Sequence, residues 1–139
     1  MATRASGQRS RIADSEKITM NLGFVDLGQI DLMVQEGFYA NRTDFIRTAI
    51  RNQLGRHDDV LKQSLARQPL ELGLRHYSKA DLEAVREAGR TIRIRVLGLA
   101  SIASDVTPEL ALSTIEEISV LGAVHASPAV KAALADRIT

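Results

Sequence analysis

The sequence contains no cysteine, and this absence sets the first limit on its chemistry. Without cysteine the chain cannot form disulfide bonds, use a thiol nucleophile or build a zinc finger. No run approaches the roughly 20 apolar residues that a membrane-spanning helix requires. Residues 1–15 are polar and have no apolar segment of the kind found in a secretory signal peptide. These absences predict a soluble, cytoplasmic protein without contact to a membrane.

The chain also has little net charge, because 18 Lys and Arg residues balance 17 Asp and Glu residues to give +1. A nucleic-acid-binding protein that is basic over its whole surface is therefore excluded, and any positive surface must be local. Residues 1–15 carry Arg4, Arg9 and Arg11 among small residues, with Asp14 as the only acid. This composition predicts a flexible basic arm, which can lie along a phosphate backbone when DNA is present.

Motifs of enzymes are missing as well. The sequence has no glycine-rich phosphate loop, no nucleophile elbow and no Ser/His/Asp spacing. The histidines His57, His76 and His125 are far apart and lack the paired spacing of structural metal sites. We therefore expect no catalytic residues, no metal and no cofactor.

The segment Lys17–Leu22 alternates strictly between polar and apolar side chains. A period of two is typical of a half-buried strand. Only this strand precedes two helical patterns, and a single strand cannot pair its own backbone groups. The simplest partner is the same strand of a second chain. A two-stranded ribbon of this kind fits the major groove of DNA.

Two amphipathic helices are predicted next. The first has Asp26 as a candidate N-cap and Gly37 as a left-handed C-cap. The second starts at Asn41, with Asp44 completing a pattern like a capping box, and ends at Gly55. The apolar positions of the two helices are Leu27, Ile30, Met33 and Val34, then Phe45, Ile46, Ala49, Ile50 and Leu54. Helices of this size bury too little surface for a stable monomer, which again predicts a dimer.

The order of strand, helix, glycine turn and second helix resembles the ribbon-helix-helix family of dimeric DNA-binding proteins (CopG-, Arc-, MetJ- and ParD-like). The resemblance is carried by Lys17–Leu22 and by the stretch Gly37–Arg47, whose Tyr-Ala-Asn-Arg-Thr-Asp-Phe-Ile-Arg end is particularly similar to ParD. It covers residues 16–55 and implies a homodimer that binds double-stranded DNA.

The resemblance also assigns DNA contacts. The outward side chains of the strand, Lys17, Thr19 and Asn21, would read base edges. Their chemistry agrees, since Lys can donate to guanine, Asn suits adenine, and Thr can contact thymine. The free N–H groups at the start of the second helix would hold a phosphate, although Asn41 can also serve only as a cap. The phosphate-contacting set is Asn41, Arg42 and Thr43, together with Arg4, Arg9 and Arg11 of the arm.

The C-terminal half has a different pattern. Leu-Gly dipeptides begin at Leu72, Leu97 and Leu121, about 25 residues apart. Apolar segments at 92–102 and 118–126 predict strands. Helices are predicted at 78–89, 108–117 and 127–137, the first with a Ser78 N-cap. Together these features predict a β/α repeat that forms a small solenoid or a stacked β layer.

The sequence thus predicts an α+β protein in four parts. These are a flexible basic arm at 1–15, a dimeric ribbon-helix-helix domain of one strand and two helices at 16–55, a linker with a short helix at 56–69, and a β/α repeat-like domain for assembly or partner binding at 70–139. We expect a sequence-specific bacterial transcriptional regulator or repressor, associated with the nucleoid and forming higher-order oligomers. Two alternatives stay open: an antitoxin whose C-terminal half binds a toxin, and a DNA-organising or segregation protein.

Overall fold

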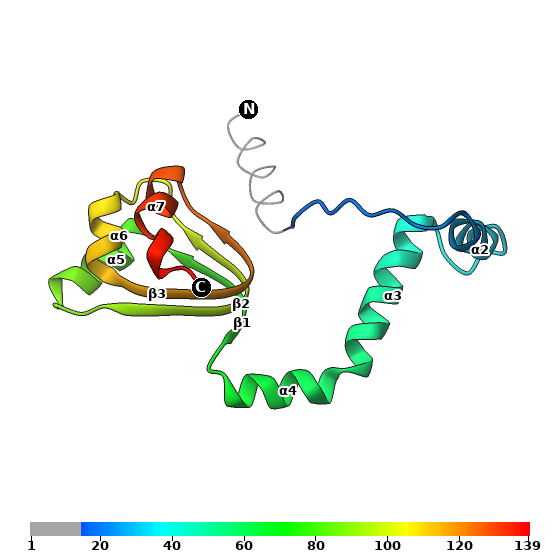
Figure 1. Cartoon of the computed structure of the whole chain (residues 1–139), viewed down its shortest axis with the longest axis horizontal. Coiled ribbons are helices and arrows are strands. Elements are labelled where there is room, and N and C mark those ends of the chain that lie inside the picture. Colours follow the sequence, from blue (N-terminus) through cyan, green and yellow to red (C-terminus); the bar gives the residue numbers. More distant parts are fainter. Residues whose placement is uncertain (1–14) are drawn as a thin grey trace. The chain divides into compact units, whose positions relative to one another are not determined.

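The computed structural model describes residues 15–139. Within them, the chain separates into two compact units, Glu16–Gln68 and Pro69–Thr139. The elements of both units are labelled in Figure 1. The arginines predicted for the basic arm, Arg4, Arg9 and Arg11, lie outside the described residues.

The N-terminal unit consists of an extended segment followed by helices. Residues 15–22 belong to no helix and pair with no strand among residues 15–139. The helices that follow are α2 (Phe24–Gln35), α3 (Arg42–Arg56) and α4 (Asp58–Arg67). The predicted Asp26 cap was wrong, because Gly23 is the N-cap and Asp26 lies in the first turn of α2. A carboxylate in that turn still faces the positive end of the helix dipole.

The turn between α2 and α3 begins as the sequence predicts. Gly37 has φ +86°, in the left-handed region that glycine adopts without steric cost. The N–H of Gly37 donates to the carbonyl of Val34 at 3.0 Å, and the N–H of Phe38 donates to the carbonyl of Met33 at 3.1 Å. These bonds satisfy carbonyl groups at the end of α2 and stop the helix.

Asn41 caps α3, which confirms the predicted start of this helix. Its Oδ1 accepts a hydrogen bond from the Asp44 N–H at 2.8 Å. The Asp44 carboxylate in turn accepts a hydrogen bond from the N–H of Ala40, the residue before the cap, at 2.9 Å. The capping pair therefore fixes the direction in which α3 leaves the turn.

The C-terminal unit is a parallel three-stranded sheet in the order β1-β2-β3. A helix follows each strand, and in Figure 1 the helices lie on the concave side of the sharply bent strands. The elements are β1 (Glu71–Tyr77), α5 (Lys79–Glu87), β2 (Ile92–Ile102), α6 (Pro108–Thr114), β3 (Ile115–His125), α7 (Pro128–Ala133) and a 3₁₀ turn (Ala135–Arg137). Ser78 caps α5 through a capping box with Asp81.

The three Leu-Gly dipeptides lie side by side in this sheet. Gly73 is in register with Gly98, and Gly98 with Gly122. All three glycines have φ between +126° and +141°. A Cβ on Gly98 would overlap the carbonyl oxygen of Gly73, and one on Gly122 that of Gly98, so these two positions require glycine for steric as well as conformational reasons.

The core of the C-terminal unit lies between the sheet and its helices. It leaves no buried side-chain polar atom of the described residues without a hydrogen-bond partner. Thr114, the buried polar residue of this core, donates its hydroxyl to the Leu110 carbonyl at 2.7 Å. The core residues are Leu82, Ile94, Val96, Ala100, Ile102, Val106, Leu110, Ala111, Ile115, Ile118, Val130 and Leu134.

Two predicted boundaries in this unit were wrong. The helix expected at 108–117 ends at Thr114, because Ile115 is fully buried and pairs with Ile92 at the start of β3. The helix expected at 127–137 ends at Ala133 and is followed by a separate 3₁₀ turn. In both places tertiary packing overrides local helix propensity.

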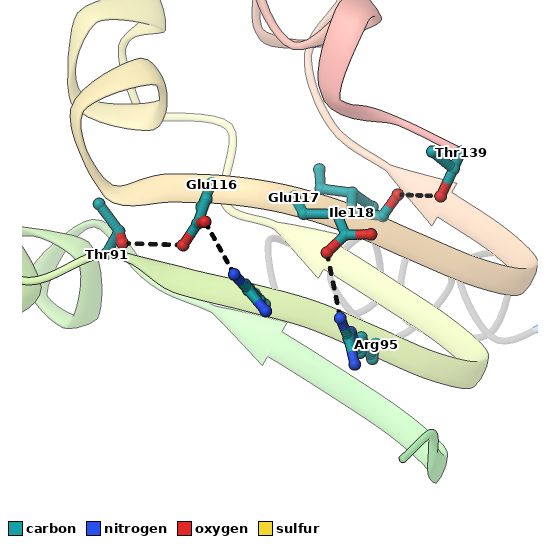
Figure 2. A network of polar contacts seen from close by, with 7 residues as sticks. Thr91, Arg95, Glu116, Glu117, Ile118 and Thr139 are labelled. Atoms are coloured by element: carbon teal, nitrogen blue, oxygen red, sulfur yellow. Dashed lines mark hydrogen bonds and ion pairs between the residues drawn. The ribbon is translucent and has the colours of Figure 1, made fainter. Parts of the chain in front are cut away.

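Polar contacts tie β3 to its neighbours, as Figure 2 shows. Arg93 bonds Glu116 at 3.1 Å, and Arg95 bonds Glu117 at 3.3 Å. The hydrogen bond from Arg93 is the main cause that lowers the pKa of the Glu116 carboxyl. On the other side of β3, the Thr139 N–H donates to the Ile118 carbonyl at 2.9 Å, and Ile138 forms a parallel bridge with Ile118.

Candidate nucleic-acid interface

A polar hollow of about 620 Å³ lies at the N-terminus of α3. Arg47 and Arg51 line it, together with residues of the first turn of the helix. Asp44 is the single carboxylate, and one of its oxygens is occupied by the Ala40 N–H. Positive charge therefore predominates, which suits an anion such as a phosphate. The lining residues are Ala40, Asn41, Thr43, Asp44, Arg47 and Arg51.

Of the three residues predicted to contact phosphate at this turn, two line the hollow and one does not. Asn41 and Thr43 line the hollow. Arg42 instead forms a two-pronged ion pair with Asp31 of α2, Nε to Oδ1 at 2.7 Å and Nη2 to Oδ2 at 2.8 Å. This hydrogen bonding lowers the pKa of Asp31 and raises that of Arg42. Arg42 thus joins α2 to α3, and a phosphate would have to compete with Asp31 for it.

Sequence reasoning missed Arg47 and Arg51 as site residues. A signal for them was present, because Thr43, Arg47 and Arg51 recur at successive turns of one helix and so share a face. The resemblance to the family drew attention only to the first turn. The structure adds the next two turns of α3 to the candidate site.

The residues predicted to read bases lie in the extended segment before α2. Lys17, Thr19 and Asn21 are all exposed. The apolar side chains between them are exposed too, with Ile18 at 81% and Met20 at 63%. Neither face of the segment is therefore covered within one chain.

The whole N-terminal unit lacks an interior. Ile30 is the only buried residue in the range 16–68. Beside it lies an apolar hollow of about 580 Å³, lined by Leu22, Asp26, Gln29, Ile30, Leu32, Met33 and Phe45. Large hydrophobic side chains are exposed throughout the unit: Ile18, Met20, Phe24, Val25, Leu32, Phe38, Ile50, Leu54, Val60 and Leu61. Exposed apolar surface on this scale marks an interaction site.

Residues 15–139 contain no group of three or more His, Asp or Glu side chains that could hold a metal ion. No helix among them is both long enough and apolar enough to cross a membrane.

An exposed segment that alternates between polar and apolar side chains thus precedes a pair of helices, and a hollow with two arginines lies at the start of the second helix. The chain belongs to the ribbon-helix-helix transcriptional regulator family, whose model matches residues 13–131. The match includes most of the C-terminal unit as well as the N-terminal unit. Comparison with curated proteins and with solved structures found no match. The family is one of DNA-binding regulators rather than of enzymes.

Proposed function

We propose that the protein is a sequence-specific transcriptional regulator that acts as a homodimer. Residues 17–22 of two chains would pair as an antiparallel ribbon and enter the major groove of DNA. The observation that supports this best is the extended segment itself, which alternates in sequence, pairs with no strand in the described part of the chain and exposes both faces.

Dimerisation would cover the apolar surface of the N-terminal unit. One face of the ribbon, with Ile18 and Met20, would pack over the helices, and the polar face would stay free for DNA. Replacing Met20 by Asp places a charge in that interface and should dissociate or unfold the unit. Thr19→Asp is the matched control, because it adds the same charge on the outward face and should leave the dimer intact. A stable folded monomer of residues 1–68 by sedimentation would contradict the proposal.

Base reading is assigned to Lys17, Thr19 and Asn21. Thr19→Ala and Asn21→Ala should each weaken binding to the preferred sequence by about 1–3 kcal/mol and relax the preference at one position. The preferred sequence can be obtained by selection from random duplexes, and affinities then compared on selected and random DNA by fluorescence anisotropy. Equal losses on both kinds of DNA would rule out base reading by these residues.

Phosphate binding is assigned to the hollow at the start of α3, whose lining includes Asn41, Thr43, Arg47 and Arg51. Arg42 would contact a phosphate by giving up its ion pair with Asp31. The arginines of the arm, Arg4, Arg9 and Arg11, would add contacts to the backbone beside the ribbon.

The C-terminal unit is proposed to assemble dimers into larger species. It has a buried core of its own, which the N-terminal unit lacks. This feature favours an assembly domain over the disordered tail expected of an antitoxin. Light scattering of the full chain should show tetramers or larger species.

A further inference from the structure

The two edges of the C-terminal sheet differ. The outer edge of β3 is covered in part by the end of the chain, through the bridge of Ile138 to Ile118 and the hydrogen bond from Thr139. The outer edge of β1 pairs with no strand among residues 15–139. A free edge presents a row of backbone donors and acceptors to a further strand.

The edge strand β1 carries few of the features that normally block pairing. Glu71–Tyr77 contains no proline and no lysine and runs for seven residues. Leu72 and Leu74 are 75% and 60% exposed. Glu71 and Arg75 are charged, but a seven-residue free edge with two exposed leucines is still expected to be covered in the working protein.

The sequence of β1 is complementary to itself in the antiparallel direction. Around Gly73 it reads Glu-Leu-Gly-Leu-Arg, so a two-fold axis at Gly73 places Glu71 opposite the partner's Arg75 and Leu72 opposite the partner's Leu74. Opposite charges and paired apolar side chains across strands are stabilising. Parallel pairing in register would instead set Glu71 against the partner's Glu71, a repulsive contact.

The local geometry permits this arrangement. No atom lies within 4 Å of the Cβ position of Gly73, so the axis is sterically open. Glu71 and Arg75 form an exposed ion pair at 2.9 Å within the chain, with half or more of each side chain in solvent. Their charges are held together at the edge and remain accessible to the opposite charges of a second copy.

We propose that two copies of the chain associate through antiparallel pairing of β1 with β1, centred on Gly73, so that their sheets become one continuous sheet. Such an interface is isologous, with the same strand contributed by each copy. The proposal rests on the assembly role of the C-terminal unit and names the surface that carries it. It is independent of how the N-terminal unit reads DNA.

The absence of cysteine allows a direct test by disulfide trapping in the full chain. Leu72→Cys and Leu74→Cys chains, co-expressed with different tags and oxidised, should cross-link to each other. Opposed residues of an antiparallel pair lie about 4.5–5.5 Å apart between Cα atoms, within the range of a disulfide. Homotypic pairs lie farther apart than the roughly 7 Å limit. Leu112→Cys on α6 is a control for random collision. Mixed cross-links no more abundant than homotypic ones would overturn the proposal.

Charge exchange gives a second test, and loss of the intrachain ion pair could not produce its expected result. Glu71→Arg alone and Arg75→Glu alone should each weaken association roughly 2- to 30-fold, because each places two like-charge pairs across the interface. Mixing the two variants should restore association, although the Glu71–Arg75 pair is broken within both chains. Mixtures that associate no better than either variant would refute the arrangement.

DNA binding separates the two proposals. Glu71→Arg and Arg75→Glu chains should still bind a single site with unchanged sequence preference, since they leave the ribbon intact. Conversely, Asn21→Ala should leave the Leu72→Cys to Leu74→Cys cross-link unchanged. A failed cross-link with normal DNA binding would reject only the β1 interface, and a normal cross-link without sequence preference would reject only the ribbon.

Discussion

The carbonyl oxygen of Gly98 stands where a Cβ on Gly122 would have to lie. The carbonyl of Gly73 has the same relation to Gly98. Each strand thus approaches the next more closely at this row than any side chain allows. This close approach in register explains why a glycine recurs at the same place in each strand.

Alanine at this row should destabilise the C-terminal unit in a graded way. Gly98→Ala and Gly122→Ala combine a positive φ with overlap against backbone, and each should lower the free energy of unfolding by at least about 2 kcal/mol. Gly73→Ala has the positive φ without the overlap and should lose only about 1–2 kcal/mol. Urea unfolding followed by circular dichroism measures the differences. Equal losses at the three positions would show that steric contact does not matter.

The ion pair between Asp31 and Arg42 should make the packing of α2 on α3 sensitive to acid. The pKa of Asp31 lies below its ordinary value of 3.8 because Arg42 donates to the carboxylate. A lowered pKa means that the pair stabilises the fold above pH 3.8, and that this contribution is lost as the pH falls through the folded-state pKa. Asp31→Asn should therefore be less stable than the natural chain at pH 7, and the difference should shrink below pH 3.8.

Asp58→Asn is a suitable control for this measurement. It removes the same charge, but its partner Lys62 lies on the same helix, so no contact between helices is lost. Thermal melts of both variants at pH 7 and pH 3 give the comparison. A stability difference for Asp31→Asn that persists unchanged at pH 3 would mean that the ion pair is not its cause.

Arg47→Ala and Arg51→Ala should weaken binding to all DNA sequences alike. Each removes one guanidinium from the hollow on α3, and each should reduce the slope of log affinity against log salt concentration by about 1. Arg56→Ala is the control, because Arg56 is on the same helix and does not line the hollow. A change in sequence preference, or no change in the salt slope, would remove these residues from the phosphate site.

A chain cut after Arg67 should keep its DNA chemistry and lose its assembly. Arg67 is the last residue of α4, and the boundary of the two units follows at Gln68. The shortened chain should remain dimeric and bind one site, but bind adjacent sites without cooperativity. Light scattering and footprinting of the full and shortened chains side by side test this. Equal oligomer size and equal cooperativity would leave the C-terminal unit without an assembly role.

The sequence by itself determined the local features that depend on short-range chemistry. The Asn41 cap, the left-handed turn at Gly37 and the capped start of α5 at Ser78 follow from residue types that satisfy helix ends. The apolar face of α2 that includes Ile30 follows from a period of 3.6 residues. The chain's membership of the ribbon-helix-helix family also followed from the order of the alternating segment, the helices and the glycine turn.

Tertiary structure alone decided features that depend on contacts between distant residues. Ile115 lies in a segment that the sequence predicted as helix, but it is the first residue of β3 because it pairs with Ile92 in the sheet. Arg42 pairs with Asp31 of the preceding helix, 11 residues away in the sequence, rather than facing the polar hollow beside it. The reason is physical: local propensity is worth tenths of a kcal/mol to about 1 kcal/mol per residue, and burial of an apolar side chain such as that of Ile115 can exceed it.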